Sequence, residues 1–129
     1  MSYLLDTHAL LWAVAEPLKL SEPARITLSE PKNELLVSSI SIFEIATKIR
    51  IGKLNVPDTL VNSWQLTLAK LNAKLLTVGG DDAALAGLWD CQHPDPFDRI
   101  LAAQAINGNH YLVSCDAAFR HFKSLRVYW

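Results

Sequence analysis

The sequence predicts one α/β domain over residues 1–129, in which helices cover both faces of a central, mostly parallel sheet of four to five strands. A chain of 129 residues suits one domain with its own core. Half of the residues are hydrophobic and 19% are charged, which is typical of globular proteins. Short apolar runs alternate with segments of helical periodicity. That alternation favours parallel strands joined by crossover helices, a three-layer α/β/α sandwich.

The N-terminal part of the chain is expected to form one strand and two helices. The apolar run of residues 3–5 is typical of a buried strand. Residues 7–15 continue as a helix, which Pro17 ends because proline lacks a backbone donor. Ser21 then caps a second helix with proline in its first turn, and this helix runs to about Glu30.

A second strand and a third helix follow. Residues 34–38 form another apolar run with the length of a strand. Ser39 or Ser41 is expected to cap the next helix, because serine side chains accept hydrogen bonds from the first helical amides. That helix extends through Ile51, and Gly52 ends it.

The middle of the chain predicts a fourth helix and a third strand. Pro57 and Asp58 are residue types that favour a helix start. Apolar residues then recur at helical spacing, and they are Leu60, Val61, Trp64, Leu68 and Leu71. Residues 73–78 are expected to form the third strand.

Two glycines and two aspartates separate that strand from the next helix. Gly79 and Gly80 predict a turn. Asp81 or Asp82 is then expected to cap a helix that runs through Trp89.

The C-terminal part repeats the helix–strand pattern. Residues 95–98 open a helix, with an aspartate as cap and a proline in the first turn, and it ends near residues 107–108. Residues 110–114 predict a fourth strand. A short helix over residues 116–122 and a fifth strand over residues 125–128 close the chain.

Composition limits the location and the class of the protein. No apolar run approaches the length of about 20 residues that a membrane span needs, so no membrane association is expected. The chain has no basic leader and reaches Asp6 too early for a signal peptide, so the expected location is the cytoplasm. Cys91 and Cys115 are predicted to be free thiols, and the histidines lack zinc-type spacing. The net charge of −1 neither indicates nor excludes a nucleic-acid substrate.

Four acids are expected to gather at one edge of the sheet. Asp6 follows the first strand and Asp116 follows the fourth. Glu44 lies in the helix after the second strand, and Asp98 lies in the first turn of the helix before the fourth. Ligands of parallel α/β sheets bind at the carboxyl ends of the strands, so these side chains define the candidate site.

Clustered carboxylates repel each other and stay ionised only beside positive charge. A set of oxygen ligands without histidine or cysteine suits Mg²⁺ or Mn²⁺. Such a cation activates water and stabilises charge on a phosphate, so phosphodiester hydrolysis is the expected reaction.

Each acid also has a purely structural explanation. Asp6 and Asp116 are suited to capping the helices that follow them. Glu44 precedes Lys48 by four residues, the order that favours a surface ion pair. Asp98 fits an acid in the first turn of a capped helix. Capping and metal binding are compatible, so these explanations stand beside the proposed site.

Several neighbours of the acids have weaker assignments. Arg99 adjoins Asp98 and is expected either to steady the acids or to hold a phosphate. His93 is expected to be an ordinary packed or exposed side chain. The helices that carry Trp12 and Trp64 are candidate interaction surfaces.

Other protein classes place acids at strand ends. A receiver-like signalling module needs an acceptor aspartate directly after the third strand, whereas Gly79 and Gly80 stand there. It also needs a lysine after the fifth strand, and the sequence has Trp129. A phosphatase with the pattern Asp-x-Asp is disfavoured because His8 occupies the second acidic position.

Four segments carry recognisable motifs, in residues 4–12, 38–53, 95–105 and 112–119. They include Leu-Leu-Asp-Thr-His-Ala-Leu-Leu-Trp, Phe-Glu-Ile-Ala, Asp-Pro-Phe-Asp-Arg and Leu-Val-Ser-Cys-Asp. In this order, over nearly the whole chain, they resemble the PIN-domain ribonucleases of the VapC-like toxin group. The Ser-Cys pair of the last motif and the His-Pro pair before the third are departures that leave the four acids intact.

The resemblance implies a PIN-like α/β/α sandwich and an Mg²⁺- or Mn²⁺-dependent endoribonuclease that cleaves single-stranded or structured RNA. It implies the toxin of a toxin–antitoxin pair, a homodimer, and a cognate antitoxin whose C-terminal segment covers the active site. By motif match, the catalytic and metal-binding roles fall to Asp6, Glu44, Asp98 and Asp116. Supporting positions fall to Thr7, Asp95 and Ser114.

The expected mechanism is attack of a water on the scissile phosphate in line with the leaving oxygen, which leaves a 5′-phosphate and a 3′-hydroxyl. One or two cations would lie among Asp6, Asp98 and Asp116, with Glu44 as a further ligand or as the group that orients the water. A catalytically silent PIN fold that serves as a binding module is the alternative from a different class.

Overall fold

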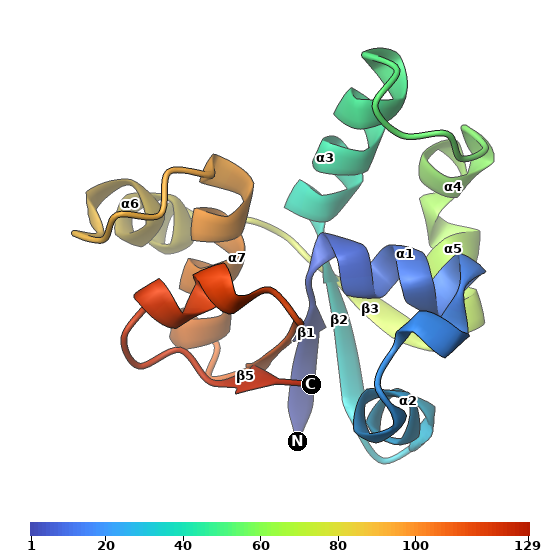
Figure 1. The fold of residues 1–129 in the computed structure, drawn as a ribbon, viewed down its shortest axis with the longest axis horizontal. Coiled ribbons are helices and arrows are strands. Elements are labelled where there is room, and N and C mark those ends of the chain that lie inside the picture. The colour runs from blue at the N-terminus through green and yellow to red at the C-terminus, as the bar shows by residue number, and fades with distance from the viewer.

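The structure is a computed structural model that describes all residues from 1 to 129, and it contains one parallel sheet with helices on both faces (Figure 1). The five strands are arranged in the order β3-β2-β1-β4-β5. Their bounds are β1 (Ser2–Leu5), β2 (Glu34–Ser38), β3 (Ala73–Leu76), β4 (Tyr111–Val113) and β5 (Val127–Tyr128). The helices are α1 (Thr7–Ala15), α2 (Glu22–Ser29), α3 (Ser39–Arg50), α4 (Thr59–Asn62), α5 (Trp64–Leu71), α6 (Gly80–Leu88) and α7 (Pro96–Asn107). Two 3₁₀ segments complete the fold, η1 (Pro17–Lys19) and η2 (Ala117–His121).

The predicted α/β/α class is confirmed. No helix of the chain has both the length and the apolar character needed to cross a bilayer.

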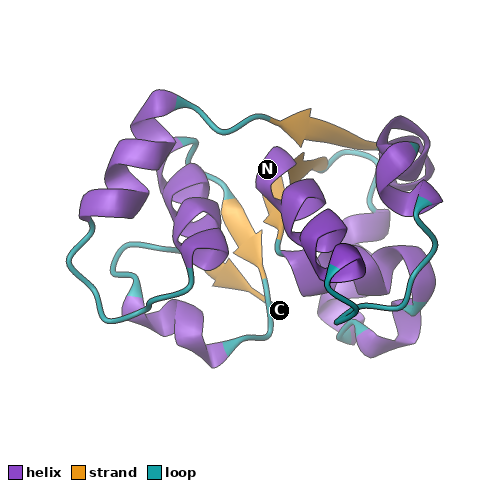
Figure 2. Ribbon diagram, turned by 90° about the horizontal axis from the view of Figure 1, so that it is seen from above, coloured by secondary structure: helices purple, strands orange, loops and turns teal.

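Alternating side chains of the strands supply two hydrophobic cores, one on each face of the sheet. Tyr3 and Leu5 point into the core that α1, α2 and α5 cover, whereas Leu4 points into the core that α7 and η2 cover. Figure 2 shows helices on both sides of the strands. Burial of both faces is typical of parallel sheets, and it holds the strands rigidly beneath the site.

The register aligns the carboxyl ends of the three central strands. Leu5 pairs with Val37 on one side and with Val113 on the other. The amide of Asp6 extends this ladder by donating to the Val113 carbonyl at 3.1 Å. The residues that follow the aligned row share one edge of the sheet, and they are Asp6, Ser38 and Ser114. Helix α3 continues directly from β2 at this edge and packs against both α1 and α7 (Figure 1).

The cap of α3 differs from the expected Ser39 or Ser41. Ser38, the last residue of β2, is the cap, and its Oγ accepts from the amide of Ile40 at 3.1 Å. Strand and helix join without a loop, so Ser39 is already helical. The Ser39 hydroxyl instead accepts from the amide of Val78 at 3.3 Å. Ser41 is buried within α3 and its side chain takes part in the site.

The single helix expected from Pro57 is in fact two helices, α4 and α5, separated by Ser63. Ser63 has φ −113° and ψ 44°, outside the helical region. Thr67 fixes the join, because its Oγ1 donates to the Leu60 carbonyl at 3.0 Å. The apolar spacing continues through the break because both helices pack on the same core, so periodicity did not reveal it.

The two glycines open α6 and do not form a separate turn. Gly79 is the N-cap and Gly80 is the first helical residue, so neither Asp81 nor Asp82 is the cap. The Asp82 carboxylate instead accepts from the amide of Gly79 at 2.8 Å, from inside the first turn.

The last three strands are shorter than expected. The edge strand β3 has one neighbour, and its pairing stops at Leu76, which pairs with Ser38 at the end of β2. β5 begins only at Val127, which pairs with Leu112 of β4. β4 begins at Tyr111 and ends before Ser114. The expected helix over residues 116–122 is the 3₁₀ segment η2.

Candidate active site at the carboxyl edge of the sheet

Asp6 directly follows β1 and is buried, with 5% of its surface exposed. Its Oδ1 accepts from the amide of Ala9 at 2.7 Å and so caps α1. Burial raises the pKa of the Asp6 carboxyl above its ordinary value, while the Ser114 side chain and the Ala9 amide oppose the shift. A positive charge nearby would likewise favour the ionised form of Asp6.

Asp116 forms a pair with Asp6, because its negative charge is close enough to contribute to the raised pKa of Asp6. Asp116 is exposed and caps η2, with Oδ1 accepting from the amide of Ala118 at 2.9 Å. Its own amide donates to Ser114 Oγ at 3.0 Å. Ser114 thus binds the backbone of Asp116, and its side chain also lowers the pKa of Asp6. We call these two acids the Asp6–Asp116 pair.

Glu44 is buried on α3 and is held at both carboxylate oxygens. Oε1 accepts from Thr7 Oγ1 at 2.6 Å, and Oε2 accepts from Lys48 Nζ at 2.7 Å. The ion pair expected from the sequence is therefore present, but Glu44 is not a surface group, since its side chain is only 7% exposed. Thr7 follows Asp6 in the chain, and its Oγ1 also lies 3.2 Å from Ser41 Oγ, so Thr7 links α3 to the residue after Asp6.

Asp98 lies in the first turn of α7, with its side chain 19% exposed. Its Oδ2 lies 2.8 Å from His93 Nε2. Burial raises the pKa of Asp98 to about 6, and the negative charges of Asp95 and Glu44 add to the shift, while His93 opposes it. Glu44 and Asp98 are therefore near enough to repel each other. We call them the Glu44–Asp98 pair.

The two other residues expected to support the site have backbone partners. Asp95 caps α7, with Oδ1 accepting from the amides of Phe97 at 2.8 Å and Asp98 at 3.3 Å. The Arg99 guanidinium donates to backbone carbonyls of the segment before α7 and makes no ion pair. Of the two roles expected for Arg99, steadying the site is favoured and holding a phosphate is not.

The structure brings the four acids to one edge as two pairs and does not close them into one cluster. No three Asp, Glu, His or Cys side chains lie together as a group able to hold a metal ion. One oxygen of Glu44 is paired with Lys48, and one oxygen of Asp98 is paired with His93. A common cation therefore requires some of these side chains to rotate toward each other.

The chemistry of the donor set nevertheless fits a hard divalent cation. The acids and the hydroxyls of Thr7 and Ser114 offer oxygen atoms, the ligands that Mg²⁺ and Mn²⁺ prefer. Cys115 adjoins the acids, and desolvation together with the negative charges of Asp6 and Asp116 raises the pKa of its thiol. A cation at this edge would also offset the desolvation and the mutual repulsion that raise the pKa values of Asp6 and Asp98.

A cavity of about 370 Å³ lies against α1 and the end of α3. Thr7 and His8 line it from α1, and Trp12 lies one helical turn further along. Lys48 and Lys53 contribute two cations to its wall, and Glu16 contributes one negative charge. None of the four acids lines the cavity, but Thr7 and Lys48 of its wall both bind Glu44.

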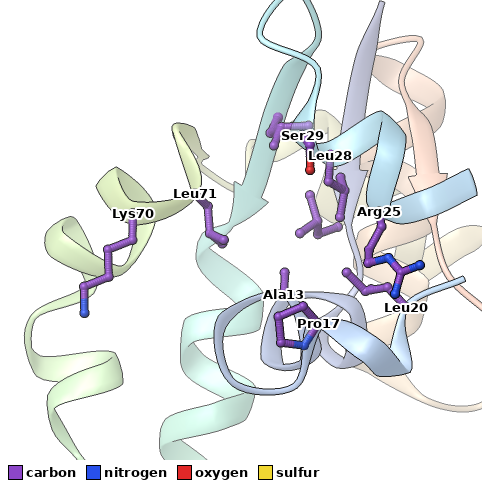
Figure 3. Close-up of a pocket in the computed structure, with 10 residues that line it drawn as sticks. Ala13, Pro17, Leu20, Arg25, Leu28, Ser29, Lys70 and Leu71 are labelled. Carbon is purple, nitrogen blue, oxygen red and sulfur yellow. The ribbon is translucent and has the colours of Figure 1, made fainter. Parts of the chain in front are cut away.

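A second cavity, of about 310 Å³, lies away from the acids among α1, η1, α2 and α5 (Figure 3). Leucines form half of its lining, whereas Arg25 and Lys70 stand on opposite sides of it. Neither cation forms an ion pair within the chain. This cavity suits an apolar partner with acidic groups more than it suits catalysis.

Two side chains of the site escaped the sequence-based assignment. His93 is buried and bonded to Asp98, but it lies in an irregular loop where no spacing signals such a contact. Ser41 is buried beside Thr7 and not at a helix cap. Its place three residues before Glu44, on the same face of α3, is the signal that could have identified it.

The sequence resembles known proteins over nearly its whole length. The sequence model of the PIN domain family matches residues 3–125. Ribonuclease VapC22 of Mycobacterium tuberculosis is 32% identical over 124 residues, which cover 95% of this chain and 93% of the relative.

Three solved structures share the fold at low sequence identity. VapBC2 from Rickettsia felis, bound to a DNA fragment from its promoter, aligns with a TM-score of 0.72 and 17% identity, over 99% of this chain and 98% of the other. DNA-bound VapBC from Salmonella typhimurium aligns with a TM-score of 0.66 and 15% identity, over 99% of this chain and 97% of the other. VapBC-1 from nontypeable Haemophilus influenzae aligns with a TM-score of 0.65 and 18% identity, over 99% of this chain and 97% of the other.

Proposed function

The chain belongs to the PIN domain family, and from this premise we propose that it is a divalent-metal-dependent endoribonuclease that acts as the toxin of a toxin–antitoxin pair. One observation carries the proposal beyond family membership. Four carboxylates from four separate segments lie toward the carboxyl edge of the sheet in two pairs, with Thr7 bound to Glu44 and Ser114 bound to the Asp116 amide. A relative of similar length is named as a ribonuclease.

The four acids are proposed to hold Mg²⁺ or Mn²⁺. When bound, the cation supplies positive charge to the phosphate oxygens and lowers the pKa of an attacking water. The Ala9 amide keeps the Asp6 carboxylate oriented through its hydrogen bond to Oδ1, and the Thr7 hydroxyl does the same for Glu44. The protein's task is to keep these oxygens facing the same edge.

The RNA backbone is proposed to follow the cavity that Thr7 and Lys48 line. The net charge of −1 gives no general attraction for a polyanion, so binding must depend on local cations. Lys48 and Lys53 supply two of them on the cavity wall. Both can contact phosphates on one side of the scissile bond while the acids contact the scissile phosphate itself.

The proposed reaction is hydrolysis. The oxygen of a water attacks the phosphorus in line with the bond to the 3′ oxygen, that bond breaks, and the 3′ oxygen takes up a proton. The products are a 5′-phosphate and a 3′-hydroxyl. A 2′,3′-cyclic phosphate among the products would instead mean that the 2′-hydroxyl of the RNA is the nucleophile.

A cognate antitoxin, a second copy of the chain and a cytoplasmic location complete the proposal. The three structural neighbours are VapBC structures, which supports an antitoxin partner. The cavity lined by Thr7, Trp12 and Lys48 offers a surface where a partner segment can approach Glu44. We propose that residues 1–129 act as one domain, in a reducing compartment that suits the two free thiols.

The test is cleavage of total cellular RNA by the purified protein, free of any partner. Reactions with Mg²⁺, with Mn²⁺ and with EDTA are compared with the same reactions of the Asp6→Asn variant. Cleavage that disappears both with EDTA and in the variant supports a metal-dependent nuclease at this site. Cleavage that survives in the variant assigns the activity elsewhere or to a contaminant, and no cleavage by the folded protein favours a binding module.

A further inference from the structure

The segment between α6 and α7 is fixed to α7 by one side chain. Arg99 Nε donates to the Ala86 carbonyl at 2.8 Å, and Nη1 donates to the carbonyls of His93 at 2.8 Å and Cys91 at 3.3 Å. Nη2 donates to the Trp89 carbonyl. One guanidinium thus reaches four carbonyls between the last turn of α6 and His93.

This set of contacts uses the geometry that distinguishes arginine from lysine. A guanidinium presents donors in a fixed planar fork, whereas an ammonium is a single point on a flexible stem. Two of the carbonyls, those of Ala86 and Trp89, belong to the end of α6, where helical carbonyls lack helical partners. Arg99 therefore ends α6 and shapes the loop after it.

The loop in turn holds one acid of the site. His93 is buried, and its ring packs near Phe119 and Phe122, with centroid separations of 6.1 and 5.3 Å. Its Nε2 lies 2.8 Å from Asp98 Oδ2, while the hydrogen bonds of the chain leave Asp98 Oδ1 without a partner. The backbone of His93 is fixed by Arg99 and its ring is fixed by the aromatic side chains.

We propose that Arg99 and His93 are positioning residues for the metal site: Arg99 sets the loop, and His93 holds Oδ2 of Asp98 so that Oδ1 is free to bind the cation. The inference rests on the proposed function, because it assigns a purpose to Asp98 as a ligand. Hydrogen-bonded neighbours of metal ligands commonly change metal affinity by about 10- to 100-fold when they are replaced. The same range is expected here.

The test measures Mn²⁺ binding by titration calorimetry, without RNA. His93→Phe keeps the aromatic packing and removes the hydrogen bond, and we expect its Mn²⁺ dissociation constant to rise at least about 10-fold. His93→Gln keeps a donor of similar reach, and its constant should stay within about threefold of the wild-type value. Asp98→Asn marks the loss expected when the ligand itself is removed.

Arg99 is tested with a matched control. Arg99→Lys keeps the charge and loses the fork, so we expect faster amide hydrogen exchange over residues 89–95 and weaker Mn²⁺ binding by about 10-fold. Arg126 also donates to a backbone carbonyl, that of Asn109 at 2.8 Å. It directly precedes β5 and so lies at the amino ends of the strands, whereas the acids lie at the carboxyl ends. Arg126→Lys should change neither measurement.

The outcomes separate this inference from the proposed function. Wild-type Mn²⁺ affinity in His93→Phe would overturn the role of His93. Faster loop exchange in Arg99→Lys with unchanged Mn²⁺ affinity would show that the loop does not position the site. A folded wild-type protein that binds no Mn²⁺ at all would refute the proposed function together with the inference, whereas the first two outcomes leave the proposed function standing.

Discussion

The Asp6–Asp116 pair and the Glu44–Asp98 pair lie on the same edge of the sheet, but different contacts hold them. Asp6 and Asp116 accept hydrogen bonds from backbone amides of the segments they cap. Glu44 and Asp98 are held by cationic or ionisable side chains, Lys48 and His93. The first pair is fixed by where β1 and β4 end, and the second by side chains that reach it from α3 and from a loop.

This difference indicates how each pair responds to change. A helix cap is retained when the new side chain keeps an acceptor at the position of the capping oxygen. Substitutions in the Asp6–Asp116 pair can therefore change activity while stability stays nearly the same. Side-chain partners compensate buried charge, so replacing either member of the second pair alters both chemistry and electrostatics.

The largest effect is expected at Asp6. Asp6→Asn keeps the cap acceptor and removes the charge, so activity should fall by about 1000-fold, or about 4 kcal/mol of transition-state stabilisation, with stability nearly unchanged. Asp6→Ala should be equally inactive and also less stable by about 1 kcal/mol, because the cap is lost. RNA cleavage rates and urea denaturation measure the two effects. Equal stability of both variants would mean that the cap is unimportant.

The next largest effect is expected within the ion pair of Glu44. Glu44→Gln should lower kcat/KM about 100-fold, because a neutral amide cannot bind a cation as a carboxylate does. Lys48→Met leaves the carboxylate in place and removes one cation from the cavity wall, so a loss of about 10-fold, mainly in KM, is expected. Steady-state kinetics on a short RNA compare the two. A loss in kcat alone for Lys48→Met would place Lys48 at the reacting phosphate.

Asp116 tests the exposed member of the first pair. Asp116→Asn should reduce activity by about 10-fold, less than Asp6→Asn, because solvent already screens an exposed carboxylate. Stability should change by less than about 0.5 kcal/mol, since asparagine also caps. The same cleavage and denaturation experiments apply. An effect as large as that at Asp6 would show that both acids contribute equally.

The smallest effect concerns the pH dependence of stability. The pKa of Asp98 is about 6 in the folded chain, above its ordinary value of 3.8, so between these values the folded state binds more protons than the unfolded state. The free energy of unfolding should therefore fall as pH rises through this window, by about 1 kcal/mol once partial exposure to solvent is allowed for. Asp98→Asn should reduce that slope in EDTA and leave the part that comes from the raised pKa of Asp6. Urea denaturation at several pH values measures this slope. An unchanged slope in Asp98→Asn would mean that another group causes the pH dependence.

The same contrast explains what sequence could predict. Strand ends and caps are local, so the positions of Asp6 and Asp116 and the bounds of α1, β2 and α7 followed from a few neighbouring residues. The contact of His93 with Asp98 depends on Arg99 and on a loop with no periodic pattern. No local rule describes such a contact.

The elements that sequence placed incorrectly share a cause. Ser38 caps α3 because strand and helix join without a loop, and Ser63 interrupts a helix whose apolar spacing continues. In each case the hydrophobic pattern is preserved and only backbone geometry changes. Periodicity reports which side of an element faces the core, and it is insensitive to where the backbone bends.

The strand order has a consequence for how such a site can diversify. From β1 the chain moves to β2 and β3 on one side, then returns past them to β4 on the other. The segments that follow β1 and β4 therefore leave toward opposite faces, α1 on one and η2 on the other. The ends of β1 and β4 therefore form the topological switch point of the sheet, the position at which parallel α/β sheets bind their ligands. Insertions or substitutions in the surrounding loops can reshape what reaches this position, while Asp6 and Asp116 keep their places on the sheet.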